Sequence, residues 1–583
     1  MASGFRRTML AALTALAISA TAAPAAAQEA TGDWTGFIEA APGTRLPLVL
    51  HIKRDDAGAL GGTVDSPMQG VQGLPLAGIG AEDGSLSFTV PAIGASYKGQ
   101  WDAAARAWNG EWSQAGQRWP LSFAVPVPPP PLPADWRLPP DTEIGKLIAA
   151  RNAPRAGQGI VVGVLGPDGQ RIVAGGTGAG ARVDRSTLFE IGSITKVFTA
   201  LILADMVNKG EVSLDDPATK FLPPGHRIPE RGGRRITLRD LATHRSGLPR
   251  MADDMGSVDD PDGPFEGYTE RRLLAFLDRY ELTRDIGSQW EYSNLGAGLL
   301  GYLLARAAST DYETLLRQRI TGPLGMTDTM ISLPPSHAER LAPAFDGHMR
   351  PARPWNIGIV TGAGGIRSSA ADMLTFARAV LDPQSPVAPA MRTALAVRTP
   401  GVHARVEQAL GWLVLRPEPG RELLLHDGGT GGFRSVLALE PAKGRAAVAL
   451  INSAVEPSAT DLVLHILLGT PAAPTPPVPP APPPPVKRTE IALSAAELDR
   501  SVGRYGFGAG FVIAVTREGE TLRVLREGVA GASALPIFPE APLAFFWKAV
   551  DAQIRFTTDA SGAVTGAVLT QGGQSFTGKR IMR

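Results

Sequence analysis

The stretch Phe189-Glu190-Ile191-Gly192-Ser193-Ile194-Thr195-Lys196 decides how this 583-residue chain is interpreted. A short strand-like run meets a glycine, and a helical stretch then continues to Lys209, where Gly210 ends it. The helical stretch is apolar on nearly every side, which is typical of a buried helix. Ser193 is therefore predicted at the N-terminus of a buried helix, with Lys196 one turn later on the same face.

A serine and a lysine placed in this way can act as a nucleophile and its base. A serine hydroxyl needs a base, whereas a free lysine, with a pKa near ~10.4, is protonated at neutral pH. Burial favours the neutral amine, and a pKa lowered by about 3 units corresponds to about 4 kcal/mol. Ser-x-x-Lys alone is weak evidence, because about one chance occurrence is expected in a chain of this length. The alternative is a helix-capping serine with a solvent-reaching lysine, but an unused charge on so apolar a helix would be unfavourable.

The second element is Tyr292-Ser293-Asn294, which precedes an apolar helix predicted over residues 299–308. A phenol near a lysine ammonium is driven toward phenolate, and such a pair can take a proton from Ser193 and pass it to a leaving group. The Asn294 amide can orient the lysine or hold a substrate carbonyl. The alternative is a core tyrosine beside a helix-capping asparagine.

The third element is His426-Asp427-Gly428-Gly429-Thr430-Gly431-Gly432, at the end of an apolar strand. Its glycines let a substrate lie close to the strand and leave backbone N–H groups free. The N–H groups of Gly429 and Ser193 are the candidates for an oxyanion hole. The alternative is a glycine-rich hairpin without a catalytic role.

These three elements, in this order, resemble the serine β-lactamase and DD-peptidase family. Tyr292 and Asn294 look like the Tyr-x-Asn of the class C branch, which includes family VIII esterases and D-amino-acid peptidases. The resemblance covers about residues 150–465. Further segments that resemble this branch are Leu241-Ala242-Thr243-His244-Arg245-Ser246-Gly247-Leu248-Pro249, Pro323-Leu324-Gly325-Met326 and Gly364-Gly365-Ile366-Arg367-Ser368.

The resemblance implies a role for each site residue. Ser193 is expected to be acylated, with Lys196 and Tyr292 as general base and acid. Asn294 is expected to position the substrate, and the amides of Ser193 and Gly429 to form the oxyanion hole. The implied fold is a helical subdomain against an antiparallel sheet flanked by helices, with the site between them.

Two positions depart from the family pattern. His426 stands where the third motif usually begins with a lysine that favours the carboxylate of β-lactams. A histidine, with a pKa near ~6.5, is mostly neutral at pH 7. Carboxylate recognition is therefore expected to be weaker, and His426 looks like some esterases and D-amino-acid peptidases of the same family. Ile286 stands where a proline is common, and we infer nothing from it.

Proline-rich tracts divide the rest of the chain. They predict linkers at 126–140 and 471–487, because such tracts favour extended spacers. Period-two alternation on either side predicts two small all-β domains, the second barrel-like and similar to one appended to some family members. The overall prediction is an α+β multidomain chain. Its predicted parts are a signal peptide at 1–27, an all-β domain at 28–125, a hydrolase domain at 141–470 and a β-barrel-like domain at 488–583.

The N-terminus resembles a secretory signal. Arg6 and Arg7 precede a short apolar core, and Ala25-Ala26-Ala27 predicts cleavage before Gln28. The apolar run is short for a membrane anchor, and no later segment is long enough to span a bilayer. The chain has no cysteine, which excludes disulfides, cysteine-ligated zinc and a cysteine nucleophile. The expected location is the periplasm or the medium.

Composition and motifs also restrict the function. The net charge of +1 gives no reason to expect nucleic acid or an anionic membrane as a partner. There is no Gly-x-Ser-x-Gly elbow and no His-Glu-x-x-His cluster, and His244 and His426 without a carboxylate motif are weak metal ligands. No cofactor or metal is expected, the partner is a small-molecule or peptide substrate, and the oligomeric state stays open.

The expected function is hydrolysis of an ester or an amide bond, including peptides with D-residues, through an acyl-Ser193 intermediate. True β-lactam turnover is one alternative. A penicillin- or peptidoglycan-binding protein without turnover is the other, and slow deacylation would distinguish it.

Overall fold

The computed structural model describes residues 30–581 except 42–43, 67–70, 115–116, 127–130, 134, 179–180, 256–262, 264, 403–404, 479–487, 509–510, 528–533, 548–551 and 572–573. The predicted signal peptide, 1–27, lies outside the described residues, as do parts of both proline-rich tracts. Two compact units are present, residues 1–128 and 129–583, and each is described by itself.

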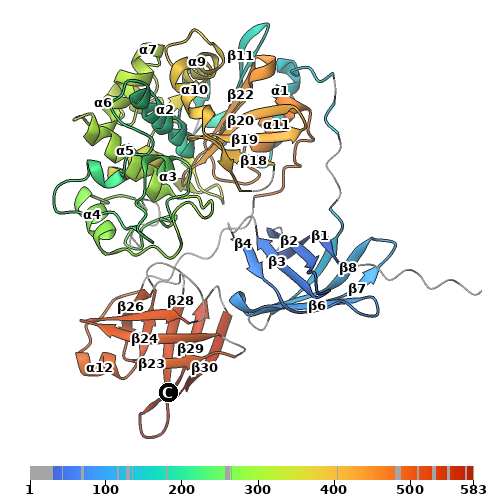
Figure 1. Ribbon diagram of the computed structural model, residues 1–583, viewed down its shortest axis with the longest axis vertical. Coiled ribbons are helices and arrows are strands. Elements are labelled where there is room, and N and C mark those ends of the chain that lie inside the picture. Colours follow the sequence, from blue (N-terminus) through green and yellow to red (C-terminus); the bar gives the residue numbers. More distant parts are fainter. Residues whose placement is uncertain are drawn as a thin grey trace, which may run out of the picture. The chain divides into compact units, whose positions relative to one another are not determined.

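The first unit contains one nine-stranded antiparallel sheet (Figure 1). Alternate residues of its strands are buried, including Leu50, Phe88 and Val90, as the period-two pattern predicts. Trp34 and Trp108 are also buried and belong to the same core. Its strands, in the spatial order β4-β3-β2-β1-β9-β8-β7-β6-β5, are β1 Gly32–Ala41, β2 Thr44–Arg54, β3 Leu60–Ser66, β4 Val71–Pro75, β5 Ala77–Gly80, β6 Ser85–Val90, β7 Ala95–Asp102, β8 Ala107–Gln114 and β9 Gln117–Ala124.

The hydrolase region is built on a second nine-stranded sheet, and its strand pairs are antiparallel. Both faces are buried: along β10, Val161 packs into the core on one face and Val162 into the core on the other. In spatial order the strands are β12 Ala181–Arg182, β11 Gly169–Gly178, β10 Gly159–Gly166, β22 Arg445–Ile451, β21 Arg434–Glu440, β20 Arg421–Gly429, β19 Leu413–Glu418, β18 Val406–Gln408 and β17 Thr399–Pro400.

Helices cover both faces of this sheet (Figure 1). Helices α1 and α11 pack on one face, where Ile148 and Ile466 belong to one core. Helix α9 packs on the other face, and α2 to α6 form the helical subdomain beyond it. The helices are α1 Asp141–Asn152, α2 Thr195–Asn208, α3 Leu238–Ala242, α4 Glu270–Arg279, α5 Asn294–Ala307, α6 Tyr312–Leu316, α7 Gly322–Leu324, α8 Pro335–Ala338, α9 Ala370–Leu381, α10 Ala388–Ala396 and α11 Thr460–Leu468, with single turns at Gly192–Ile194, Ala218–Phe221, Arg317–Thr321, Gly358–Ala363 and Pro441–Lys443.

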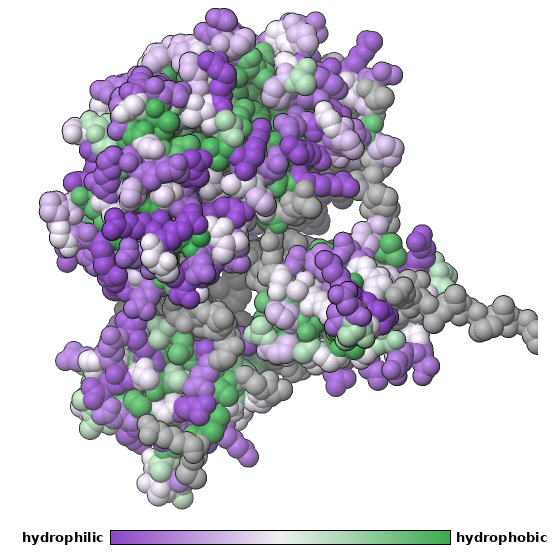
Figure 2. All heavy atoms as spheres, viewed as in Figure 1, coloured by the Kyte–Doolittle hydropathy of each residue, from purple (hydrophilic) through white to green (hydrophobic). Residues whose placement is uncertain are grey.

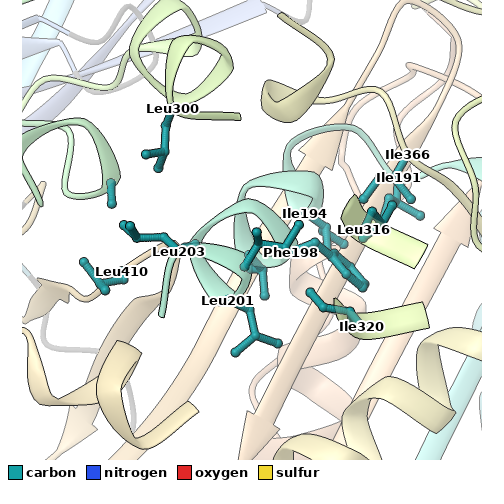
Figure 3. Packing of buried hydrophobic residues seen from close by; sticks show 14 of the residues in the cluster. Ile191, Ile194, Phe198, Leu201, Leu203, Leu300, Leu316, Ile320, Ile366 and Leu410 are labelled. Carbon is teal, nitrogen blue, oxygen red and sulfur yellow. The ribbon is translucent and has the colours of Figure 1, made fainter. Parts of the chain in front are cut away.

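Helix α2 is the centre of the helical subdomain. Eleven of its fourteen residues are buried, as its sequence predicts. Apolar side chains from several elements surround it (Figure 3), and Phe198 stacks on Phe376 of α9 with ring centroids 4.4 Å apart. Because neighbours pack on every side, the helix gives rigid support to the residues at its N-terminus.

The C-terminal part forms a closed eight-stranded barrel, as expected, preceded by the short helix α12 Ala495–Asp499. Ile513, Val515 and Phe556 fill its interior. Its strands are β23 Gly503–Gly506, β24 Val512–Glu518, β25 Thr521–Arg526, β26 Leu535–Ala541, β27 Ala544–Phe546, β28 Ala552–Thr558, β29 Val564–Gln571 and β30 Gln574–Ile581. The expected architecture, a hydrolase region flanked in the sequence by two all-β parts, is confirmed.

The end of the first proline-rich tract contacts the hydrolase region. The N–H of Leu132 donates to Glu418, and the indole N–H of Trp136 donates to the carbonyl of Ile466, so the end of this tract packs on the hydrolase region.

Polar side chains, in purple, predominate on the face of the hydrolase region drawn in Figure 2. In the part of the chain that the structure describes, no helix has the length and apolarity needed to cross a membrane.

Candidate active site

The turn that carries Ser193 is fixed by two strands. Strand β13, Leu188–Glu190, pairs with β16, Arg367–Ser369, and leads directly into the turn. Gly192 has a φ of 49°, a conformation that favours glycine. A Cβ atom on Gly192 would lie 2.7 Å from the backbone nitrogen of Gly429, so the end of β20 lies directly against this turn. The two candidate oxyanion-hole residues, Ser193 and Gly429, are thereby brought together.

Lys196 points its amine at Ser193 from inside the protein. Its side chain is buried, and Nζ lies 3.1 Å from Ser193 Oγ, 2.9 Å from Asn294 Oδ1 and 2.7 Å from the carbonyl oxygen of Ala363. Burial and the nearby Arg250 guanidinium hold the pKa of Lys196 well below its usual range. The direction agrees with the expectation from sequence.

A neutral amine fits these three neighbours. It has two N–H groups and one lone pair. The oxygens of Asn294 and Ala363 can only accept hydrogen bonds, so they take the two N–H groups. The lone pair is then left for the hydroxyl proton of Ser193, which is the arrangement that a general base requires.

Tyr292, which lies just before α5, is also in contact with Ser193. Its hydroxyl lies 2.7 Å from Ser193 Oγ, and its ring lies 4.8 Å from Lys196 Nζ. Burial raises the pKa of Tyr292 well above its usual range, and the hydrogen bond with Ser193 opposes this only in part. The pKa of this phenol is therefore shifted away from phenolate by burial, in the direction opposite to the shift expected from a nearby lysine ammonium.

His244 supports Tyr292. The two rings lie 4.6 Å apart at 33°, and His244 has a φ of 58°. The backbone N–H of Ser293 donates to His244 Nδ1 at 3.1 Å, so the imidazole is neutral with its proton on Nε2. Burial lowers the pKa of His244 well below its usual range. Neither His244 nor any other described residue belongs to a cluster suited to hold a metal ion.

Asn294 is the first residue of α5, so this helix begins five residues earlier than the sequence pattern predicts. Ser293 caps the helix by accepting a hydrogen bond from the N–H of Gly296 at 2.8 Å. The cap fixes the first turn of the helix, on which Asn294 lies. Its Oδ1 is bound by Lys196, and its Nδ2 lies 3.6 Å from the sulfur of Met251.

His426 is neutral and buried. Its Nδ1–H donates to the carbonyl oxygen of Asp427 at 2.7 Å. Burial lowers the pKa of His426 to about 4, with Asp427 opposing the shift. The family's lysine is therefore replaced here by an uncharged ring at physiological pH.

Three site residues were missed from the sequence. Asp427 lies inside the third motif, and its side chain is exposed beside Lys196 and Tyr292. Its negative charge acts to raise the pKa of Lys196, against the effect of burial, and also acts to raise the pKa of Tyr292. Arg250 directly follows the segment 241–249, and its guanidinium lies 5.0 Å from the Tyr292 ring. Ala363 contributes only its carbonyl oxygen, so no side-chain pattern could have identified it.

Comparison with known proteins agrees with the motifs. The family model described as Beta-lactamase matches residues 144–469. The chain is 33% identical over 291 residues to the D-alanyl-D-alanine-carboxypeptidase/endopeptidase AmpH of Escherichia coli (strain K12), covering 47% of this chain and 73% of that protein. It is 26% identical over 368 residues to a beta-lactamase of Lysobacter lactamgenus, covering 57% of this chain and 91% of that protein.

A solved structure is similar as well. It is a beta-lactamase/D-alanine carboxypeptidase from Yersinia pestis complexed with citrate, with 26% identity and a TM-score of 0.47, covering 55% of this chain and 93% of that chain. The resemblance inferred from the three motifs is confirmed by the family model, which matches more than half of the sequence. The chain belongs to the beta-lactamase family, and it is a serine hydrolase.

Proposed function

We propose that the chain is an exported serine hydrolase that cleaves an ester or amide bond through an acyl-Ser193 intermediate. One observation carries this proposal: Ser193 Oγ lies 3.1 Å from the buried amine of Lys196 and 2.7 Å from the hydroxyl of Tyr292. A nucleophile with a base on one side and an acid on the other is what acyl transfer requires.

Acylation follows from the protonation states of the free site. The lone pair of Lys196 takes the proton of Ser193 as Oγ forms a bond to the substrate carbonyl carbon. The N–H groups of Ser193 and Gly429 stabilise the negative charge on the carbonyl oxygen. Tyr292 then gives its proton to the leaving alcohol or amine as the bond to it breaks. The site is left as an ammonium and a phenolate, which stabilise each other.

Deacylation uses the same groups in reverse. The Tyr292 phenolate takes a proton from water as the water oxygen attacks the acyl carbon. Ser193 Oγ leaves and receives the proton held by Lys196. Serine, lysine and tyrosine all return to their starting states, so the cycle balances without a cofactor.

The charges around the site favour ester or peptide substrates over β-lactams. His426 is neutral, and the exposed carboxylate of Asp427 stands next to it on β20. Neither side chain attracts a carboxylate at this strand. The family resemblance places the carboxylate of a β-lactam at this strand. The relative AmpH, named as a carboxypeptidase and endopeptidase, supports the peptidase part of this proposal.

β-Lactam turnover is the second candidate. The Ser193, Lys196 and Tyr292 geometry is compatible with it, and the relative from Lysobacter lactamgenus is named a beta-lactamase. A penicillin-binding protein without turnover would share the acylation step and differ in the lifetime of the acyl-enzyme. Export and the division into domains joined by proline-rich linkers are part of the proposal and rest on the sequence alone.

A substrate panel tests the proposal. Wild-type protein is assayed with a chromogenic ester, a D-alanyl-D-alanine peptide and a chromogenic cephalosporin. Ser193→Ala is expected to abolish turnover of every substrate that the wild type cleaves, and Ser336→Ala, at an exposed serine of α8, is the matched control. Substantial activity of Ser193→Ala would refute the proposed mechanism. Cleavage of the cephalosporin at a rate above that of the ester and the peptide would favour the second candidate.

A further inference from the structure

Arg250 is an exposed arginine at the edge of the candidate site. Its guanidinium carbon lies 5.0 Å from the centre of the Tyr292 ring, within the range of a cation–π contact. Tyr292 in turn is hydrogen-bonded to Ser193. One aromatic ring therefore separates this cation from the predicted nucleophile.

The backbone of this segment is held firmly. The carbonyl oxygen of Arg250 accepts hydrogen bonds from the N–H groups of Asn294, at 3.0 Å, and Leu295, at 3.2 Å. Ser293 Oγ donates to the carbonyl of Pro249 at 2.6 Å. The backbone of this segment is thus fixed to the first turn of α5, the helix that begins at Asn294.

Stacking leaves the hydrogen-bonding capacity of Arg250 unused. A guanidinium that contacts an aromatic ring keeps its five N–H donors, and these match the two oxygens of a carboxylate. Among the described residues, no carboxylate lies within ion-pairing distance of Arg250. An exposed cation with free donors is suited to bind an anion that arrives with the substrate.

The charge on β20 makes this position the better place for a substrate anion. His426 carries no charge, and Asp427 would repel a carboxylate at the strand edge. Lys196 is buried, and its amine is already surrounded by three partners. Arg250 is the cation over the Tyr292 ring that a substrate can reach from solvent.

We propose that Arg250 determines specificity by binding a carboxylate on the acyl part of the substrate next to Tyr292, so that the preferred substrates are esters or peptides with an anionic group on the acyl side of the cleaved bond. This inference rests on the proposed acyl-Ser193 function. It assigns Arg250 a recognition role and no role in the bond-making steps.

Two matched substrates test the inference. One is a chromogenic ester with a free carboxylate on its acyl part, and the other is the same ester with that carboxylate as a primary amide. Arg250→Ala is expected to lower kcat/KM for the carboxylate ester about 10- to 100-fold, mainly through KM, as for a lost charge-assisted hydrogen bond. For the ester that carries the primary amide in place of the carboxylate, kcat/KM is expected to change less than about 3-fold. The ratio of the two kcat/KM values is therefore the readout.

Two further variants make the result unambiguous. Arg250→Lys keeps the charge without the planar donors and is expected to recover part of the ratio. Arg271→Ala, at an exposed arginine of α4, is the control and should leave the ratio unchanged. An effect of Arg250 on the pKa of Lys196 would change kcat/KM for both substrates by the same factor, so it cancels in the ratio. An unchanged ratio in Arg250→Ala would overturn the inference, whereas turnover by Ser193→Ala would overturn the proposed function instead.

Discussion

The amine of Lys196 lies 3.1 Å from the hydroxyl oxygen of Ser193, and its other two hydrogen-bond partners are both carbonyl oxygens. The two carbonyls orient the neutral amine so that its lone pair points at the hydroxyl. Burial in the apolar surroundings of α2 lowers the pKa of the amine and so favours its neutral form. The position and the protonation state of the proposed base therefore have the same structural origin.

Replacement of Lys196 by methionine should separate activity from stability. Turnover is expected to fall about as far as in Ser193→Ala, because members of one catalytic unit are not additive. The folded state should be no less stable, since an apolar side chain suits the buried helix better than an amine does. Steady-state kinetics and thermal unfolding measure the two effects. A Tm that falls by several degrees would show that Lys196 is a structural residue.

Tyr292→Phe removes one oxygen and keeps the ring against His244 and Arg250. The loss of the proton donor is expected to reduce kcat about 10²- to 10⁴-fold with little change in KM. The decrease in kcat should be smaller for a substrate with a good leaving group, such as a nitrophenyl ester, than for an amide. A good leaving group departs with less need for a proton from Tyr292. Equal losses for both leaving groups would argue against Tyr292 as the general acid.

The pH dependence of kcat/KM should report Lys196 and Tyr292. Activity needs a neutral lysine and a protonated tyrosine, so the rate falls at low pH as Lys196 gains a proton and at high pH as Tyr292 loses one. Asp427 raises both pKa values. Asp427→Asn is therefore expected to move both limbs of the pH profile to lower pH.

Arg250 lowers both of these pKa values, so it supplies the opposite control. Arg250→Ala should move both limbs to higher pH, measured with an uncharged ester. Shifts of the two variants in the same direction would contradict the electrostatic account. Because the pKa of His426 is about 4, no inflection near 6.5 is expected from it.

The contact between β20 and the Ser193 turn depends on a glycine. A Cβ atom on Gly428 would lie 2.1 Å from the carbonyl oxygen of Ile191. Gly428→Ala should push the strand away from the turn, cost about 1–3 kcal/mol of stability and reduce kcat. Gly145→Ala, on the solvent-facing side of α1 with no neighbour within 4 Å, is the control and should not destabilise the protein. Unchanged kcat in Gly428→Ala would show that this approach does not position the oxyanion hole.

The structure brings the residues of the three motifs together, and the sequence could indicate them because each motif joins a polar side chain to a helix or strand with a clear pattern. Ser193 and Lys196 are separated by one helical turn, so their contact follows from local geometry. Tyr292 and Asn294 are about a hundred residues away, and only the family resemblance placed them beside Ser193. The hydrogen bonds of both residues agree with that placement.

Other features depend on burial and on backbone groups that no motif records. The sequence suggested a phenolate at Tyr292, whereas burial keeps the phenol protonated. The start of α5 was predicted too late because the first turn, from Asn294, is formed by a cap and glycines that weaken the apolar pattern. Arg250 carries no motif of its own, and its position became evident only from the Tyr292 ring beside it.

The most direct test of the account is the intact mass of the purified protein followed over time with a carboxylate-bearing ester and, separately, with benzylpenicillin. A covalent adduct that maps to Ser193, is absent in Ser193→Ala and is short-lived is expected with the ester. With benzylpenicillin, little or no adduct and little consumption of the drug are expected. An adduct on another residue, or ester turnover that persists in Ser193→Ala, would contradict the central claim that Ser193 is the acylated nucleophile.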